Sequence, residues 1–242
     1  MEAIRIEGLT KRYKDVTAVD GLSLTVERGE LLALLGVNGA GKTTTVKMLS
    51  GLTQPTSGDA FLNGKSIVND ASAVKAMIAV SPQETAVASG LSVRENLELM
   101  YGVHGFPKSD RKGKVEQIAA KLGLDAVMNK KAGKLSGGWQ RRLSIAMALI
   151  SEPEILFLDE PTLGLDVLAR AELWEHIRAL KGTVTVILTT HYMEEAEMLS
   201  DRVAIMKDGK LLVCDTAAAI KQRAQTDRFE DAFIRFAQGV VQ

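Results

Sequence analysis

The sequence predicts an α/β fold with a mainly parallel sheet, an N-terminal antiparallel β portion and an inserted helical segment. Short, continuous apolar runs, typical of strands buried on both faces, recur between residues 31 and 206. Helical stretches lie between most of these runs, and such alternation indicates parallel strands joined by crossovers. Before residue 27 apolar and polar residues alternate instead, whereas helical spacing dominates residues 84–150.

Composition limits the class of protein. The 242 residues, 46% hydrophobic and 25% charged, suit one large globular domain with a full core. Because 30 basic residues balance 30 acidic ones, we expect no nucleic-acid partner. Cys214 is the one cysteine, which excludes an internal disulfide and a cysteine metal cage. The charged N-terminus does not resemble a signal peptide, and the apolar runs are shorter than the ~18 residues of a membrane span.

The strands follow from two patterns. Ile4 and Ile6, then Leu22, Leu24 and Val26, alternate with polar residues and predict two half-buried strands. After these, the continuous apolar runs predict buried strands at residues 31–36, 76–81, 154–159, 183–190 and 202–206. Asp208-Gly209 predicts a hairpin turn into a last strand.

Helical spacing completes the chain. Helices between strands are predicted to stop at Gly51 and Gly182, and Ser92 with Glu95 forms a capping box. Three apolar helical faces follow, at Val93–Leu97–Met100, Val115–Ile118–Leu122 and Leu143–Met147–Ile150, and Phe229, Phe233 and Phe236 suggest a packed tail helix. We therefore expect one domain over residues 1–242, with a core (1–83 and 151–220), a helical subdomain (about 84–150) and a helical tail (about 221–242).

Residues 36–43, GVNGAGKT, form a phosphate-binding loop in the context such a loop requires, after a strand and before a helix. Backbone N–H groups would wrap the phosphates, and the helix N-terminus adds partial positive charge. Lys42 would reach the β- and γ-phosphates, and the Thr43 hydroxyl would bind Mg²⁺. The fold is then a P-loop NTPase with a RecA-like sheet. Expected nucleotide contacts are Gly36, Asn38, Gly39, Gly41, Lys42, Thr43 and Thr44.

A second acidic element follows a later strand. Residues 154–160, EILFLDE, read as a buried strand that ends in two carboxylates. Asp159 at the strand tip would hold Mg²⁺, directly or through water. Glu160 points elsewhere and is placed to polarise an attacking water.

With these motifs the chain resembles the ATP-binding subunit of ABC transporters over nearly its whole length. Residues 135–139, LSGGW, are similar to the signature motif of that family, usually written LSGGQ. Their order, between a glutamine in VSPQ and a histidine in LTTHY, also fits. The remaining matches are Gln83, His191, Asp166 of the D-loop (with Val167 where proline is frequent) and Tyr13, an aromatic expected to stack on adenine.

The resemblance implies ATP and Mg²⁺ as ligands and an ATP-dependent, head-to-tail homodimer. Ser136, Gly137 and Gly138 would donate to the γ-phosphate of an ATP held by the partner copy, and Asp166 would contribute to that nucleotide site. His191 would contact the γ-phosphate, while Gln83 would contact Mg²⁺ and the attacking water. Lys42, Gln83, Glu160 and His191 are thus the expected catalytic set.

Trp139 departs from the family pattern, and two interpretations are open. In the first, the position tolerates variation, because the serine and the glycines bind the phosphate. In the second, the indole packs at the dimer interface and slows the opening of the closed dimer.

The implied function is ATP hydrolysis that energises a separate integral-membrane permease, at the cytoplasmic face of the membrane. The stretch from Thr190 to Leu212 and the tail are most similar to the branch with daunorubicin-type and polysaccharide or lipid exporters, which favours export of a drug, lipid or polysaccharide. An uptake subunit, or an ABC-family ATPase of translation or DNA repair, are the alternatives. A phosphotransferase kinase would leave Ser136 to Gly138 unexplained.

Overall fold

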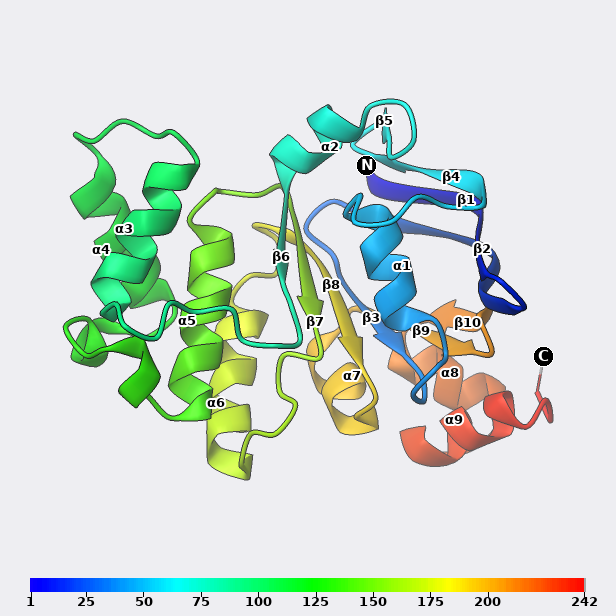
Figure 1. The fold of residues 1–242 in the computed structure, drawn as a ribbon. Helices are drawn as coiled ribbons and strands as arrows, with labels where there is room; N and C mark the ends of the chain where they lie inside the picture. Colours follow the sequence, from blue (N-terminus) through cyan, green and yellow to red (C-terminus); the bar gives the residue numbers. More distant parts are fainter. Residues whose placement is uncertain (242) are drawn as a thin grey trace.

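The structure, a computed structural model, describes residues 1–241 and contains two sheets (Figure 1). The four-stranded sheet has the order β2-β1-β4-β5 and the six-stranded sheet the order β10-β9-β3-β8-β7-β6. The strands are β1 Glu2–Tyr13, β2 Val16–Glu27, β3 Leu31–Leu35, β4 Ser57–Leu62, β5 Lys65–Ser66, β6 Ile78–Ser81, β7 Ile155–Asp159, β8 Thr185–Thr190, β9 Arg202–Lys207 and β10 Lys210–Asp215. The α-helices are α1 Lys42–Leu49, α2 Ala71–Met77, α3 Val93–Val103, α4 Arg111–Lys121, α5 Gly137–Leu149, α6 Val167–Arg178, α7 Met193–Leu199, α8 Ala217–Arg223 and α9 Phe229–Ala237.

The predicted α/β fold is confirmed. In the six-stranded sheet β6, β7, β8, β3 and β9 run parallel, and β10 closes the edge antiparallel to β9. The smaller sheet is antiparallel, with Ile4 opposite Val26 and Ile6 opposite Leu24. The segment with alternating apolar and polar residues therefore forms strands of the antiparallel sheet, and the continuous apolar runs form the parallel strands.

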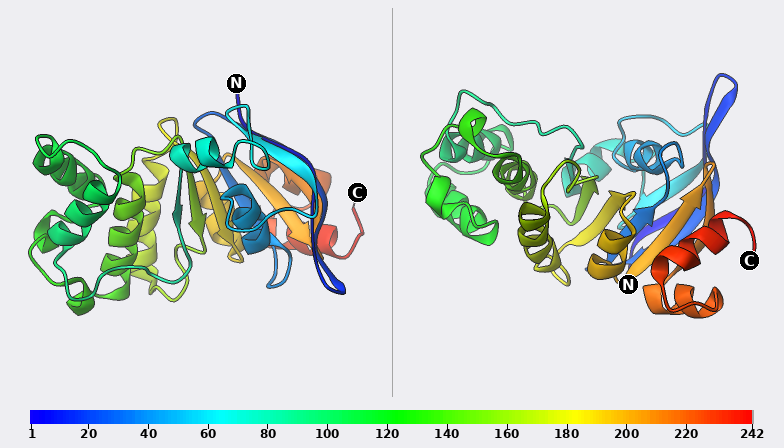
Figure 2. Two further views of the ribbon diagram at one scale, coloured as in Figure 1. Left: turned by 45° about the horizontal axis from the view of Figure 1, so that its top comes forward. Right: turned by 90° about the horizontal axis from the view of Figure 1, so that it is seen from below.

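Each buried strand supplies two cores, because successive side chains point to opposite faces. Leu32 and Leu34 of β3 join the core formed with α1 and the antiparallel sheet. Ala33 and Leu35 pack instead with the core of α7, α8 and α9. Figure 2 shows α1 and the C-terminal helices on opposite sides of the six-stranded sheet.

Two predicted strands are shorter than expected. The segment 76–81 is not a strand buried on both faces: Ala76 and Met77 end α2, and β6 is an edge strand whose side chains are largely half-buried. The strand expected from residue 183 begins at Thr185. The backbone N–H groups of Thr183 and Val184 both donate to Leu180 O, so these two residues belong to the turn after α6.

The hairpin of β4 and β5 and the helix α2 were not predicted. Asn63 (φ 46°) and Gly64 (φ 78°) form the turn between the two strands in left-handed conformation. An Asn-Gly pair is the strongest short hairpin signal, so the sequence contained the information.

The helices α3, α4 and α5 form the part drawn in green in Figure 1. Ser92 caps α3, and the predicted capping box with Glu95 is present. The helix α5 packs on α3 and α4 but also on β6, β7 and α6, so it joins the helical part to the sheet. Phe229, Phe233 and Phe236 of α9 are buried, as expected for packing. Within residues 1–241 no helix has the length and apolar character needed to cross a membrane.

Candidate functional site

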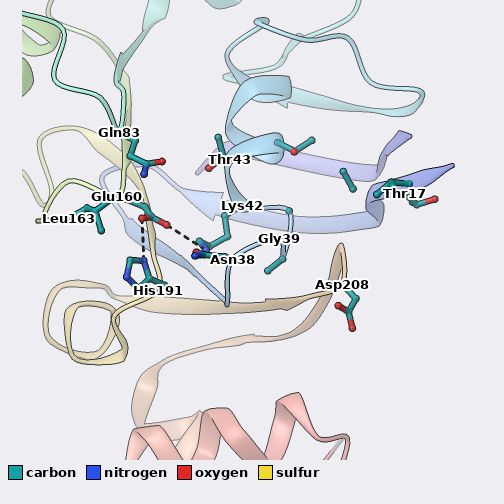
Figure 3. Close-up of a pocket in the computed structure, with 15 residues that line it drawn as sticks. Thr17, Asn38, Gly39, Lys42, Thr43, Gln83, Glu160, Leu163, His191 and Asp208 are labelled. Atoms are coloured by element: carbon teal, nitrogen blue, oxygen red, sulfur yellow. Dashed lines mark hydrogen bonds and ion pairs between the residues drawn. The ribbon is translucent and has the colours of Figure 1, made fainter. Parts of the chain in front are cut away.

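Three adjacent strands of the parallel sheet end at one edge, and each delivers a part of the site. The loop after β3 carries residues 36–43, β7 ends at Asp159, and His191 follows β8. Parallel α/β sheets place ligands at this carboxyl edge of their strands. A cavity of about 750 Å³ lies there (Figure 3).

Most of the predicted site residues line this cavity. They are Asn38, Gly39, Gly41, Lys42, Thr43, Thr44, Gln83, Glu160 and His191. The lining also includes residues that were not predicted, namely Val16, Thr17, Ala18, Ala40, Leu163 and Asp208. Asp208 and its neighbour Gly209 were visible only as a turn, and nothing in their local sequence indicates a ligand.

The loop glycines are required by the backbone around them. Gly41 has φ 102°, and a Cβ there would lie 2.5 Å from Ala18 O. A Cβ on Gly36 would collide with the backbone oxygen of Met206. Side chains at either position would displace β2 or β9, apart from any effect on a phosphate. Gly36 packs against the chain in this way and is not part of the cavity lining.

Lys42 is 5% exposed and folds back on its own loop. Its Nζ donates to Gly36 O at 2.7 Å and Val37 O at 3.3 Å, and lies 3.8 Å from Glu160 Oε1. Burial lowers the pKa of Lys42, and the negative charges of Glu160 and Asp159 oppose that effect. An anion in the cavity would supply the remaining compensation for this buried ammonium.

Glu160 lies between two cationic or polar groups. Its Oε1 faces Lys42, and its Oε2 is 3.1 Å from His191 Nδ1 (Figure 3). The residue has φ 46°, a left-handed conformation that costs a non-glycine residue about 1 kcal/mol. Two acceptors on Thr189, O and Oγ1, hold the Glu160 N–H, each at 3.1 Å. Backbone strain that the surrounding hydrogen bonds hold in place is found most often at functional sites.

Asp159 and Thr43 supply oxygen ligands that fit Mg²⁺. Thr43 Oγ1 donates to Asp159 Oδ1 at 3.2 Å, and Thr189 Oγ1 donates to the same oxygen at 2.5 Å. Hydroxyl and carboxylate oxygens are the hard donors that Mg²⁺ prefers. Thr43 lines the cavity, whereas Asp159 is buried and is not part of the lining. Gln83 extends toward the site from the end of β6 (Figure 3).

Arg141 holds the Gln83 loop and was missed by the sequence reasoning. It is 4% exposed, and it donates to Pro82 O at 2.6 Å and to Gln83 O. Because Arg141 lies on α5, the helix that begins with the signature also fixes the backbone of Gln83.

The signature residues lie away from this cavity, at the start of α5. Ser136 and Gly137 are exposed, and Ser136 makes no side-chain cap hydrogen bond. Gly138 is buried, and a Cβ on it would lie 2.9 Å from the Ala169 Cβ of α6. Asp166 caps α6 by accepting from Ala169 N at 2.9 Å. Close packing of α5 against α6 therefore also requires glycine at position 138. The predicted contact of Gly138 with the phosphate of a partner copy stays a prediction.

Tyr13 and Trp139 also lie outside the cavity lining. Tyr13 ends β1 with its ring exposed and Lys11 Nζ 5.0 Å from its centroid. Trp139 is half-buried, with the Arg142 guanidinium 4.5 Å from its ring centroid. Arg142 in turn pairs with Glu172 of α6. The indole thus has a packing role inside its own chain.

Comparison with known proteins agrees with this geometry. A family model described as "ABC transporter" matches residues 19–163, and one described as "AAA domain, putative AbiEii toxin, Type IV TA system" matches residues 131–196. The Daunorubicin resistance ATP-binding protein DrrA3 of Streptomyces coeruleorubidus is 41% identical over 94% of this chain and 72% of its own length. The Nod factor export ATP-binding protein I of Ralstonia nicotianae is 40% identical over 86% of this chain and 65% of its own length.

Other relatives are much longer. This chain spans 25% of ABC transporter A family member 11 of Arabidopsis thaliana, at 40% identity over 93% of this chain. Among solved structures, one titled "Structure of ATP binding subunit of ABC transporter" superposes with a TM-score of 0.84, at 25% identity, over 97% of this chain and 99% of that one.

Proposed function

This chain belongs to the ABC transporter family as an ATP-binding, ATP-hydrolysing subunit, and we propose the roles of its residues and its partners from that premise. The observation that carries the proposal is Glu160, held between Lys42 and His191 at the mouth of the phosphate cradle.

We infer that ATP lies along residues 36–44, with Lys42 turned from its loop carbonyls onto the β- and γ-phosphates. Thr43, Asp159 and Gln83 would hold Mg²⁺, which neutralises charge on the phosphate oxygens when bound. Glu160 accepts a proton from the attacking water, and His191 orients Glu160 and the γ-phosphate. Most of the acceleration then comes from positioning and electrostatics. Tyr13, on the strand leading to Val16 of the lining, would stack on adenine.

A head-to-tail homodimer accounts for the exposed signature. Ser136 and Gly137 present unused donors at the N-terminus of α5, away from the cavity of their own chain. A helix N-terminus with exposed backbone N–H groups attracts phosphate. We propose that these groups and Asp166 complete the ATP site of a second copy.

We propose that the dimer drives a separate integral-membrane permease in export, which would place it at the cytoplasmic face of the membrane. Support comes from the daunorubicin resistance and Nod factor export relatives. The permease would dock by the helical subdomain of about residues 84–150, next to Gln83, and the core would be residues 1–83 and 151–220. A drug, lipid or polysaccharide is the proposed cargo class.

Two variants test the ATPase roles. Glu160→Gln keeps the shape of the side chain but not the base, so we expect an ATP-bound dimer on gel filtration and nearly no phosphate release. Lys42→Ala removes the phosphate contact, so we expect loss of tight ATP binding and of the dimer. Wild-type hydrolysis in either variant would remove the role assigned to that residue.

The partner is tested by pulling tagged protein from gently solubilised membranes of its own cell. A co-purifying integral-membrane protein supports the transporter. Ribosomal or DNA-repair proteins without a membrane protein would support the alternative, an ABC-family ATPase of translation or repair.

A further inference from the structure

Glu195 is a buried carboxyl that the proposed mechanism does not use. It lies in the first turn of α7 and is 0% exposed. A carboxyl is rarely fully buried without partners, because burial of its charge is costly. Its surroundings therefore indicate what it does.

Three elements meet at this carboxyl. Trp174 of α6 donates from Nε1 to Glu195 Oε1 at 3.1 Å. The hydroxyls of Thr162, in the loop after β7, and Thr190, at the end of β8, lie close enough to favour its charged form. Arg170, whose guanidinium lies over the rings of Trp174 and Tyr192, adds a favourable charge.

Two of these three elements carry Glu160 and His191, the groups proposed to act on ATP. Thr162 follows Glu160 by two residues, and Leu163 N donates to Glu160 O at 3.2 Å. Thr190 precedes His191, and its Oγ1 accepts from Tyr192 N at 2.9 Å on the other side of the histidine. Trp174 lies on the helix that Asp166 caps.

Burial dominates the ionisation of this group and raises the pKa of Glu195. A protonated carboxyl also suits the hydrogen-bond inventory. Its Oε2 and the Thr162 Oγ1 are both buried and lack a well-formed hydrogen bond. An O–H on Oε2 can donate to Thr162 while Oε1 accepts from Trp174.

We propose that Glu195 is a positioning residue that joins the Glu160 loop, the His191 loop and Trp174, and so holds Glu160 and His191 at their hydrogen-bond distance. Glu195 is not among the residues that line the cavity. This inference rests on the roles proposed for Glu160 and His191. Loss of the carboxyl should therefore slow turnover without weakening ATP binding.

The test is steady-state ATP hydrolysis by the full chain with Mg²⁺, in four single variants and the Glu195→Ala/Trp174→Phe double variant. We expect Glu195→Ala to lower kcat about tenfold, because the activation barrier rises. The KM for ATP should stay within about twofold of wild type. Glu195→Gln, which keeps one acceptor and one donor without charge, should restore the lost rate. Trp174→Phe removes the N–H donor together with part of the ring and should lower kcat. In the double variant with Glu195→Ala, the two losses should not add in full. The matched control is Glu194→Ala, an exposed neighbour, which should behave as wild type.

Wild-type kcat in Glu195→Ala overturns the inference, and so does a Gln variant as slow as the Ala variant. If Glu195→Ala does not fold, Trp174→Phe decides, because full turnover there excludes a positioning role for the pair. Glu160→Gln is measured in parallel. Retained turnover in that variant removes the proposed function, whereas its loss together with full activity in Glu195→Ala removes only the role of Glu195.

Discussion

His191 Nδ1 lies 3.1 Å from Glu160 Oε2, so the histidine after β8 directly contacts the carboxylate after β7. The contact joins two segments that are adjacent in the sheet and separated by 31 residues in sequence. Because the imidazole of His191 contacts Glu160, we expect a substitution of His191 to affect ATP hydrolysis more than ATP binding.

His191→Ala should slow ATP hydrolysis by about a hundredfold, because the base loses the group that orients it. ATP affinity should fall far less, since Lys42 and the loop backbone are untouched. Turnover and binding of a fluorescent ATP analogue measure the two effects. His104→Ala, an exposed histidine on the helical part, is the control and should change neither. Equal losses in turnover and affinity would contradict the orienting role.

Gly138 and Gly137 should respond differently to alanine. A Cβ on Gly138 would lie 2.9 Å from the Ala169 Cβ, so Gly138→Ala should lower the free energy of unfolding by about 1–3 kcal/mol. A Cβ on Gly137 meets Leu165 at 3.7 Å, an ordinary contact, so Gly137→Ala should keep stability but lose turnover. Urea unfolding and phosphate release measure this pair. Ala169→Gly, added to Gly138→Ala, should recover part of the lost stability, less the cost of a glycine in α6. A double variant less stable than Gly138→Ala by the full cost of that glycine would argue against the helix contact.

Trp139→Gln should lower the free energy of unfolding by about 1 kcal/mol, because the ring contact with Arg142 is lost. Trp139→Phe keeps a ring over the guanidinium and should lose less. Dissociation of the ATP-bound dimer, followed after dilution, should keep its rate in both variants. Faster dissociation in Trp139→Gln would instead show that the indole also packs at the dimer interface.

The tail helix should contribute stability rather than chemistry. Phe233 is 7% exposed in the core shared with α8 and β10, so Phe233→Ala should cost about 3–5 kcal/mol. Its neighbour Ile234 is 42% exposed, and Ile234→Ala should cost under about 1 kcal/mol. Urea midpoints compare the two. Similar costs would contradict the packing of α9.

The sheet and the phosphate loop could be predicted because their signals are local. A continuous apolar run such as residues 31–35 needs cover on both faces, and GxxxxGKT has meaning only between a strand and a helix. The edge strand β6 was misjudged because an apolar run does not reveal how many neighbours its strand has.

Contacts between distant segments could not be predicted in this way. The motif predicts that Gly138 binds phosphate. It does not reveal that Gly138 packs against Ala169, which lies on another helix. Glu195 is one of several acidic residues in MEEAE, and only the arrangement of α6 and α7 shows that it is buried against Trp174. The role of Arg141 likewise depends on a distant segment, because it donates to the backbone of Pro82 and Gln83 in the loop after β6.

The strand order has a consequence for how the protein is made. β8 lies between β3 and β7, although it is synthesised after both. A nascent chain that has not yet delivered Thr185–Thr190 from the ribosome contains Thr43 and Asp159, but has no strand to set them side by side. We therefore expect competence to bind ATP to arise late in synthesis, when β8 enters the sheet between strands made earlier.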